Sequence, residues 1–185
     1  MPPPSAQDAS SPLMAGSATA AAMSMSPDSA FRRYSAYVAA IAHRLLGRDD
    51  DVDDAVQEVF MAAIRGMHAV RDEHALKAWL ACVTVRVAHR KLRNRRMWRF
   101  LGLDDSPDYE TVADGGASPE QRALLARVYE ALDGVPTDAR VAWTLRYVEG
   151  ERLEAVAELC GCSLATAKRR IATAQQQLGK ELGDA

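Results

Sequence analysis

Apolar residues recur at three- and four-residue spacing along most of the chain, which is the period of amphipathic helices. Phe31, Tyr34, Val38, Ile41 and Leu45 form the first such series. No stretch alternates with the two-residue period of a strand, so we expect an all-α fold. The predicted helices span residues 31–46, 52–67, 76–100, 118–134, 137–150 and a helical pair over 151–178.

Several helix ends carry recognisable signals. Ser118 is expected to cap a helix, with Pro119 in its first turn and Gln121 completing a capping box. After a Gly-Val-Pro break, Thr137 or Asp138 is expected to cap the next helix.

The pair over residues 151–178 has the layout of a helix-turn-helix DNA reader. Gly161 breaks the first helix and Ser163 caps the second. The buried side of the second helix is predicted to hold Leu164, Ala167, Ile171, Ala174 and Leu178. Its other side carries Thr166, Lys168, Arg169, Arg170 and Thr173.

Two segments interrupt the helical pattern. Residues 1–29 are rich in Pro, Ala, Ser and Met and lack Lys and Arg until Arg32, so we expect a disordered tail. Residues 101–117 hold five acids and no basic residue, which predicts a flexible acidic linker. The remainder divides into two small helical domains, residues 30–100 and 118–185.

Composition places the protein among ordinary globular chains, with 185 residues and 48% hydrophobic content. Three cysteines, no secretory signal and no apolar run of membrane-spanning length favour a cytoplasmic protein. Cys160 and Cys162 lack further ligands nearby, so we interpret them as packing residues and expect no metal. The net charge is only −2, but the charges are strongly segregated.

The predicted helix over residues 52–67 carries a compact acidic face. A calcium loop is excluded, because Asp54 stands where glycine is required and Phe60 where a bidentate Glu is required. Judged from the charges alone, these acids have two ordinary explanations. They form a solvent-exposed face, or they lie near the N-terminus of a helix, where the helix dipole favours negative charge.

The helix over residues 76–100 has the opposite character. It holds eight Lys and Arg residues and no acid. They are Lys77, Arg86, Arg90, Lys91, Arg93, Arg95, Arg96 and Arg99. Because a solvated helix normally interleaves both signs, these uncompensated cations predict a polyanionic partner. Met97 and Trp98 are candidates for stacking or apolar contact, and Trp98 is equally a candidate core anchor.

Particular motifs now narrow the interpretation. Residues 53–60, DDAVQEVF, resemble the core-polymerase-binding motif of bacterial sigma factors, and Ala78-Trp79-Leu80 resembles the segment that follows it. Residues 145–150 (LRYVEG), 157–163 (AELCGCS) and 166–171 (TAKRRI) resemble the C-terminal domain of the same family. Over residues 30–182 the chain resembles a sigma-70 family member of the compact extracytoplasmic-function group, which has only sigma regions two and four.

The resemblance implies a role for each group of residues. Asp53, Asp54, Gln57, Glu58 and Phe60 would bind the beta-prime clamp helices of core RNA polymerase, whose beta subunit is a further expected partner. The loop over residues 67–75 would bind the minus-ten promoter element together with Arg86, His89, Arg90, Arg93 and Arg96. The minus-thirty-five element would be read by Thr166, Lys168, Arg169, Arg170 and Thr173.

The implied function is transcription initiation: to bind core polymerase, direct it to promoters and help open the DNA. No catalytic residue and no cofactor is expected. Family members are commonly held inactive by an anti-sigma factor, so such a partner is expected here. The chain has Arg86, Arg169 and Thr173 where the family often has Asn, Ser and Arg, so a different promoter preference is expected.

Three alternatives compete with this interpretation. The pair over residues 151–178 would be a plain helical hairpin, although the basic helix and the motifs argue against that. A helix-turn-helix regulator that is no polymerase subunit has no need of the Asp53–Phe60 motif. A nuclease built on the Asp cluster would need acid–His pairing at catalytic spacing, which the four histidines do not provide.

Overall fold

The computed structural model describes residues 25–67, 70, 72–103, 109 and 117–183, and within them the chain forms seven helices and no strand. The all-α prediction is confirmed. The helices are α1 (Pro27–Leu46), α2 (Asp49–Gly66), α3 (Glu73–Phe100), α4 (Pro119–Gly134), α5 (Thr137–Tyr147), α6 (Leu153–Leu159) and α7 (Leu164–Gly183). The predicted tail and most of the predicted linker lie outside the described residues.

Some helix ends follow the local signals and others do not, since α1 begins at Pro27 rather than residue 31 and α2 at Asp49 rather than residue 52. Ser118 caps α4 and forms the predicted capping box with Gln121. The long basic helix begins before the predicted residue 76, because the Asp72 carboxylate accepts a hydrogen bond from the Ala75 amide at 2.8 Å. The predicted cap of α5 is wrong: Thr137 is already helical, and Pro136 precedes it without a side-chain cap.

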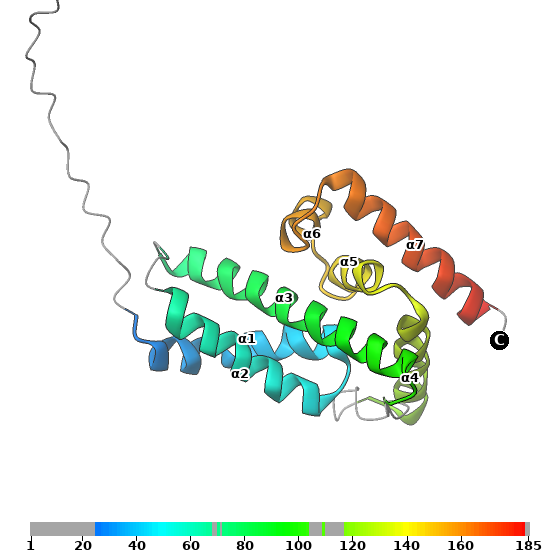
Figure 1. Cartoon of the computed structure of the whole chain (residues 1–185), viewed down its shortest axis with the longest axis horizontal. Coiled ribbons are helices and arrows are strands. Elements are labelled where there is room, and N and C mark those ends of the chain that lie inside the picture. Colours follow the sequence, from blue (N-terminus) through cyan, green and yellow to red (C-terminus); the bar gives the residue numbers. More distant parts are fainter. Residues whose placement is uncertain (1–24, 68–69, 71, 104–108, 110–116, 184–185) are drawn as a thin grey trace, which may run out of the picture.

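The long helix α3 lies at the centre of the molecule, with α1 and α2 on one side and α5 to α7 on the other (Figure 1). Buried residues of the first three helices, such as Val38, Val59 and Leu80, belong to the same apolar core as Val141 and Val156 of the C-terminal half. The sequence predicts two domains but not that they pack together. In the part of the chain that is described, no helix has the length and apolar character of a membrane-spanning segment.

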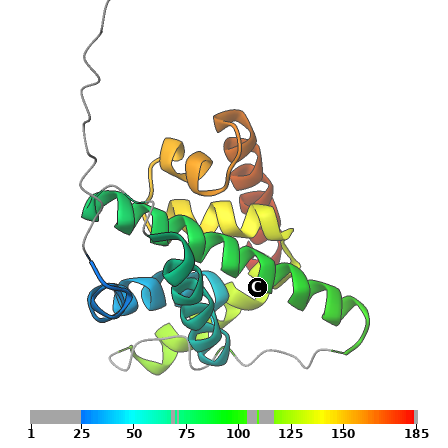
Figure 2. The ribbon, with the colours of Figure 1, turned by 60° about the vertical axis from the view of Figure 1, so that its left-hand side comes forward.

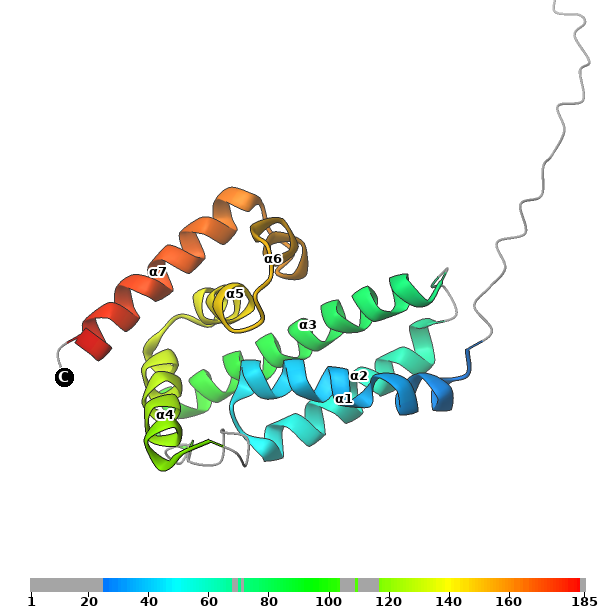
Figure 3. The same cartoon turned by 180° about the vertical axis from the view of Figure 1, so that it is seen from behind.

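The halves also meet at the corner where α1 turns into α2. Here α4 lies across the end of α1 (Figure 3), and the Tyr129 hydroxyl donates to the Arg44 carbonyl at 2.8 Å. Tyr109, one of the described residues of the linker, is buried and stacks on Tyr129 with ring centroids 5.4 Å apart. Burial raises the pKa of Tyr129 to about 12, which keeps its hydroxyl a hydrogen-bond donor.

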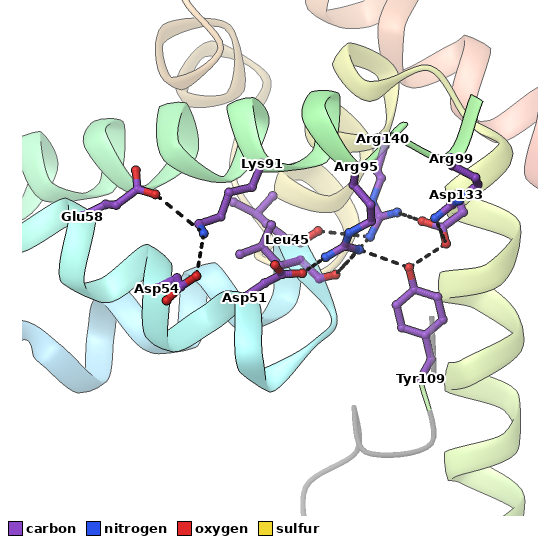
Figure 4. A network of polar contacts seen from close by, with 11 residues as sticks. Leu45, Asp51, Asp54, Glu58, Lys91, Arg95, Arg99, Tyr109, Asp133 and Arg140 are labelled. Atoms are coloured by element: carbon purple, nitrogen blue, oxygen red, sulfur yellow. Dashed lines mark hydrogen bonds and ion pairs between the residues drawn. The ribbon is translucent and has the colours of Figure 1, made fainter. Parts of the chain in front are cut away.

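Two buried arginines complete this corner (Figure 4). Arg95 of α3 donates to the Leu46 carbonyl at 3.2 Å and pairs with Asp51. Arg140 of α5 donates to the carbonyls of Leu45 and Leu46 at 3.3 and 3.4 Å and pairs with Asp133. The last carbonyls of α1 have no partners within the helix, so these arginines satisfy them and bring both halves to one point.

Gly47 makes the corner possible. Its φ of 70° is in the left-handed region, and a Cβ there would lie 2.5 Å from the Tyr129 ring. Gly102 has a similar φ of 69°, but no described residue lies within 4 Å of the place of its Cβ. Substitution of each glycine by alanine therefore distinguishes two costs: backbone strain, which both positions share, and steric overlap of the new Cβ, which only Gly47 would have.

We expect Gly47→Ala to lower the free energy of unfolding by about 2–4 kcal/mol, as the sum of strain and overpacking. Gly102→Ala should cost only the strain, about 1 kcal/mol. Urea denaturation followed by circular dichroism measures both. Equal losses for the two variants would mean that the tyrosine pair does not press on Gly47 in solution.

Candidate functional site

The acidic face of α2 splits into free and paired carboxylates. Asp53 is exposed and has no ion pair among the described residues. Glu58 pairs with Arg90 and Lys91, and Asp54 also pairs with Lys91, at 3.5 Å (Figure 4).

The other two residues of the predicted polymerase-binding set differ in burial. Gln57 is exposed beside Asp53 and Glu58. Phe60 is buried and packs edge-on against Phe31 at 4.9 Å, so it supports this face from beneath. Phe31, the first residue of the apolar series over 31–45, is 46% exposed.

The cations of α3 are not uncompensated, and that part of the sequence interpretation is wrong. Besides Arg90 and Lys91, Arg95 pairs with Asp51 and Arg99 pairs with Asp133 at 3.0 Å. Their acidic partners come from α2 and α4, so no inspection of α3 alone reveals them. Arg95 in particular is a core residue, 8% exposed, and is unavailable to an external partner.

A smaller group of cations remains open. Arg86 and Arg93 are exposed and have no carboxylate within ion-pair distance among the described residues, and Arg96 donates only to the Val135 carbonyl at 3.2 Å. Arg86 and Arg90 line a groove of about 530 Å³ between α2 and α3. Its other lining residues are Gln57, Glu58, Met61, Ala62, Arg65, Trp79, Val83 and Val87.

The second helix of the predicted helix-turn-helix, α7, also carries both unpaired and ion-paired basic residues among the described residues. Ser163 caps α7, accepting from the Thr166 amide at 3.2 Å. Lys168 and Arg169 are exposed without a carboxylate partner in the described chain, whereas Arg170 pairs with Asp138 at 2.7 Å. The Thr173 hydroxyl donates to the Arg169 carbonyl at 3.0 Å.

The apolar side of α7 follows the prediction except at one end. Ala167, Ile171, Ala174 and Leu178 are buried as expected. Leu164, in the first turn, is 39% exposed.

Asp138 connects the two candidate nucleic-acid surfaces. It accepts from Arg170 of α7 and lies 2.6 Å from Nε2 of His89 on α3. Burial raises the pKa of this carboxyl, but the contacts with His89 and Arg170 outweigh it and leave the pKa below its usual value. One carboxylate thus holds a residue from each surface, beside a cleft of about 370 Å³ lined also by Arg86 and Cys160.

The cysteines show no arrangement for metal binding. Burial raises the pKa of Cys160 to about 11, which disfavours the thiolate that a metal or an oxidant would need. Among the described residues, no group of three or more His, Cys, Asp or Glu side chains is placed to hold a metal ion.

Sequence reasoning missed Asp133, Asp138 and Tyr109, which join the two halves. A weak signal was available. Asp133 and Asp138 flank the Gly-Val-Pro break between two helices, where a carboxylate is well placed to face a neighbouring element. Trp98, a candidate core anchor, is instead 49% exposed.

We expect Asp138→Asn to loosen the contact between the halves, because it removes the negative charge that His89 and Arg170 share. The pair is partly exposed, so the effect should be modest, about 0–1 kcal/mol. Small-angle scattering at low salt should show a larger mean radius of gyration than for Glu154→Gln, which alters an exposed acid with no ion pair among the described residues. An unchanged radius would show that Asp138 does not hold the halves together.

The pH dependence of this contact follows from the direction of the pKa shift. A carboxyl with a lowered pKa stabilises the fold above its ordinary pKa of 3.8, and the contribution is lost as the pH falls through the lower folded value. The contribution of the Asp138 carboxyl itself should therefore be present at pH 5 and fade only in strong acid.

Comparison with known proteins places both halves in one family. Residues 30–97 match sigma-70 region 2, and residues 125–178 match sigma-70 region 4. The ECF RNA polymerase sigma-E factor of Haemophilus influenzae is 29% identical over 159 residues, which cover 81% of this chain and 84% of the relative. The corresponding protein of Escherichia coli K12 is 28% identical, with 81% and 83% covered.

Two further proteins that this chain resembles are also sigma factors. The sigma factor SigE of Mycolicibacterium smegmatis is 30% identical over 155 residues, covering 82% of this chain and 59% of the longer relative. Among solved structures, the sigma factor RpoE of Bartonella quintana, determined with the anti-sigma factor NepR, has the same fold. Its TM-score is 0.63 at 24% identity, over 84% of this chain and 96% of that one.

Proposed function

The chain belongs to the sigma-70 family, in its extracytoplasmic-function group. From that premise we propose which of its surfaces bind polymerase and which bind promoter DNA. As a sigma factor it directs RNA polymerase to promoters and is a non-catalytic subunit. We assign residues 30–100 to region 2, 101–117 to the linker and 118–185 to region 4. We place the protein in the cytoplasm, where core polymerase and promoter DNA are found.

The acidic face of α2 is the proposed docking surface for the beta-prime clamp helices. Asp53 and Gln57 are free to make contacts at once, with Phe60 supporting the face from the core. Asp54 and Glu58 would first have to break their ion pairs with Arg90 and Lys91 and then pair with cations of the polymerase. Docking would then release two α3 cations toward DNA, so polymerase binding and DNA binding reinforce each other.

The observation that carries this proposal is the side-by-side position of the two faces. Glu58 of α2 and Arg90 of α3 share both an ion pair and the groove between these helices. A protein bound to α2 and a nucleic acid bound to α3 would therefore meet at one edge.

Charge reversal tests the docking surface. Asp53→Lys should weaken binding to core polymerase roughly tenfold, since it places a cation where the partner needs a carboxylate. Because Asp53 has no internal ion pair among the described residues, the fold should be unaffected. Glu130→Lys, the same change on an exposed acid of α4, is the control in a fluorescence titration with core enzyme. Equal affinity of the two variants would contradict the assignment to α2.

The exposed side of α3 is the proposed minus-ten surface, formed by Arg86, His89, Arg90, Arg93 and Arg96. Cations along a groove with apolar walls fit a displaced strand, whose backbone is anionic and whose bases are flat and apolar. We infer that this side also helps to hold the promoter open. The loop over residues 67–75 is proposed to take part, and residues 68, 69 and 71 of it lie outside the described chain.

The outward side of α7 is the proposed reader of the minus-thirty-five element. Lys168 and Arg169 are free to enter the major groove, with Thr166 and Thr173 flanking them, and Arg170 would join on leaving Asp138. Since His89 depends on the same carboxylate, separation of the halves would free both surfaces together.

We expect Lys168→Ala and Arg169→Ala each to weaken binding to the minus-thirty-five element about tenfold, as expected for loss of a major-groove contact. Lys180→Ala, on the same helix about 18 Å further along its axis, serves as the control. Band-shift titration of the holoenzyme on duplex promoter DNA measures all three. If only Lys180→Ala weakens binding, the wrong end of α7 has been placed in the groove.

The family function is tested by transcription from a promoter library. Core polymerase with this chain should select and transcribe templates from a pool randomised at both promoter elements. A chain that binds DNA but neither binds core polymerase nor starts transcription would be a helix-turn-helix regulator instead.

An anti-sigma factor is a proposed further partner. The Bartonella quintana sigma factor of the same fold was solved with one, NepR. A protein that holds the two halves of this chain together would keep both proposed DNA surfaces covered.

A further inference from the structure

Arginine side chains from both halves gather where the C-terminal part of α3 meets α4 and α5. In Figure 2, α3 (green) lies against α5 (yellow), and these helices supply Arg95, Arg96 and Arg99 on one side and Arg140 on the other. They surround a small cavity of about 10 Å³. Its other lining residues are Leu92, Leu132, Asp133, Val135 and Thr137.

The one carboxylate that lines this cavity, Asp133, is already shared among several donors. Its Oδ1 accepts from Arg140, and its Oδ2 accepts from Arg99 at 3.0 Å and from the Tyr109 hydroxyl at 2.7 Å. Figure 4 shows these side chains converging on it. Asp133 is therefore fully used by two cations and has nothing left for a third.

The remaining arginines leave an excess of positive charge. Arg95 pairs with Asp51, but Arg96 donates only to the Val135 carbonyl at 3.2 Å and has no ion pair among the described residues. The four guanidinium groups at the cavity thus pair with two carboxylates in the described chain. Positive charge in a partly buried place is unfavourable unless an anion joins it.

Hydrogen-bond donors at the cavity also lack acceptors. Arg140 is 3% exposed, and its Nε has no hydrogen-bond partner in the described chain. Thr137 is the first residue of α5, and no side chain caps the amides of that helix start, which favours negative charge. Water would accept these hydrogen bonds, but it would leave the charge uncompensated.

The size of the cavity limits the ligand. Its 10 Å³ are room for about one water-sized sphere, which fits a single-atom anion and excludes phosphate, sulfate and organic acids. We propose that this cavity binds one chloride ion, held by Arg96, Arg99 and the Nε of Arg140. Because α3 belongs to the first half of the chain and α5 to the second, the ion would join the halves. Chloride binding here does not depend on the roles proposed above for polymerase and DNA contacts.

The experiment uses the free full chain at constant ionic strength, with sodium gluconate replaced stepwise by sodium chloride. The width of the chloride NMR line reports binding, because the bound ion relaxes faster than the free ion. We expect saturable broadening, together with a midpoint of thermal unfolding that rises with chloride concentration. Arg96→Ala should weaken chloride binding roughly tenfold, as expected for loss of a charged hydrogen-bond donor.

Arg93→Ala is the matched control. It removes the same charge from an exposed arginine of α3, about one helical turn before Arg96, that does not line the cavity. This variant should keep the chloride affinity of the wild-type chain. Because Arg96 is also exposed, both variants should remain folded, which circular dichroism verifies.

Anion selectivity tests the size of the site on the wild-type chain, independently of the stability of any variant. Bromide should compete with chloride at similar concentration, whereas phosphate should compete at least about tenfold more weakly, because it does not fit. The chloride site is wrong if Arg96→Ala binds chloride as tightly as the wild-type chain or if Arg93→Ala loses as much affinity. It is also wrong if phosphate competes as well as bromide, since the anions would then bind to surface cations outside the cavity.

Discussion

The end of α1 is the point on which the arrangement of both halves depends. Two buried arginines, Arg95 from region 2 and Arg140 from region 4, donate to its last carbonyls. Each arginine is paired, with Asp51 and Asp133 respectively, so the buried charges are compensated. Loss of either carboxylate would leave a buried cation without its partner. The corner therefore fixes where α3 and α5 lie, and with them every surface that we propose to contact polymerase or DNA.

Around this corner, the protein satisfies its cations with its own carboxylates. Glu58 holds Arg90, Asp133 holds Arg99, and Asp138 holds His89 and Arg170. Several of these cations are the ones that we propose to bind DNA. Partly exposed pairs of this kind are weak, so a partner with many phosphates can replace them at small cost. The fold thus keeps the free protein compact without making its surfaces permanently unavailable.

Local sequence predicted much of the structure because the signals are local. Helix period, the Ser118 capping box and the Ser163 cap act over a few residues, and each appears where it was expected. The motif at Asp53–Phe60 identified the family for the same reason. The prediction of an uncompensated basic helix was wrong, since the counter-charges lie 32 to 49 residues away for Arg90, His89 and Arg95.

By itself, the sequence determined the all-α class, the positions of the helices and the sigma-70 family, since these depend on periodicity and on short motifs. The tertiary structure alone decided which charged residues are free. Arg93 and Arg95 are neighbours of the same type in one helix, yet Arg93 is exposed and Arg95 is buried against Asp51. That difference depends on which way each side chain points from α3 and on what packs there, and only the folded chain brings those elements together.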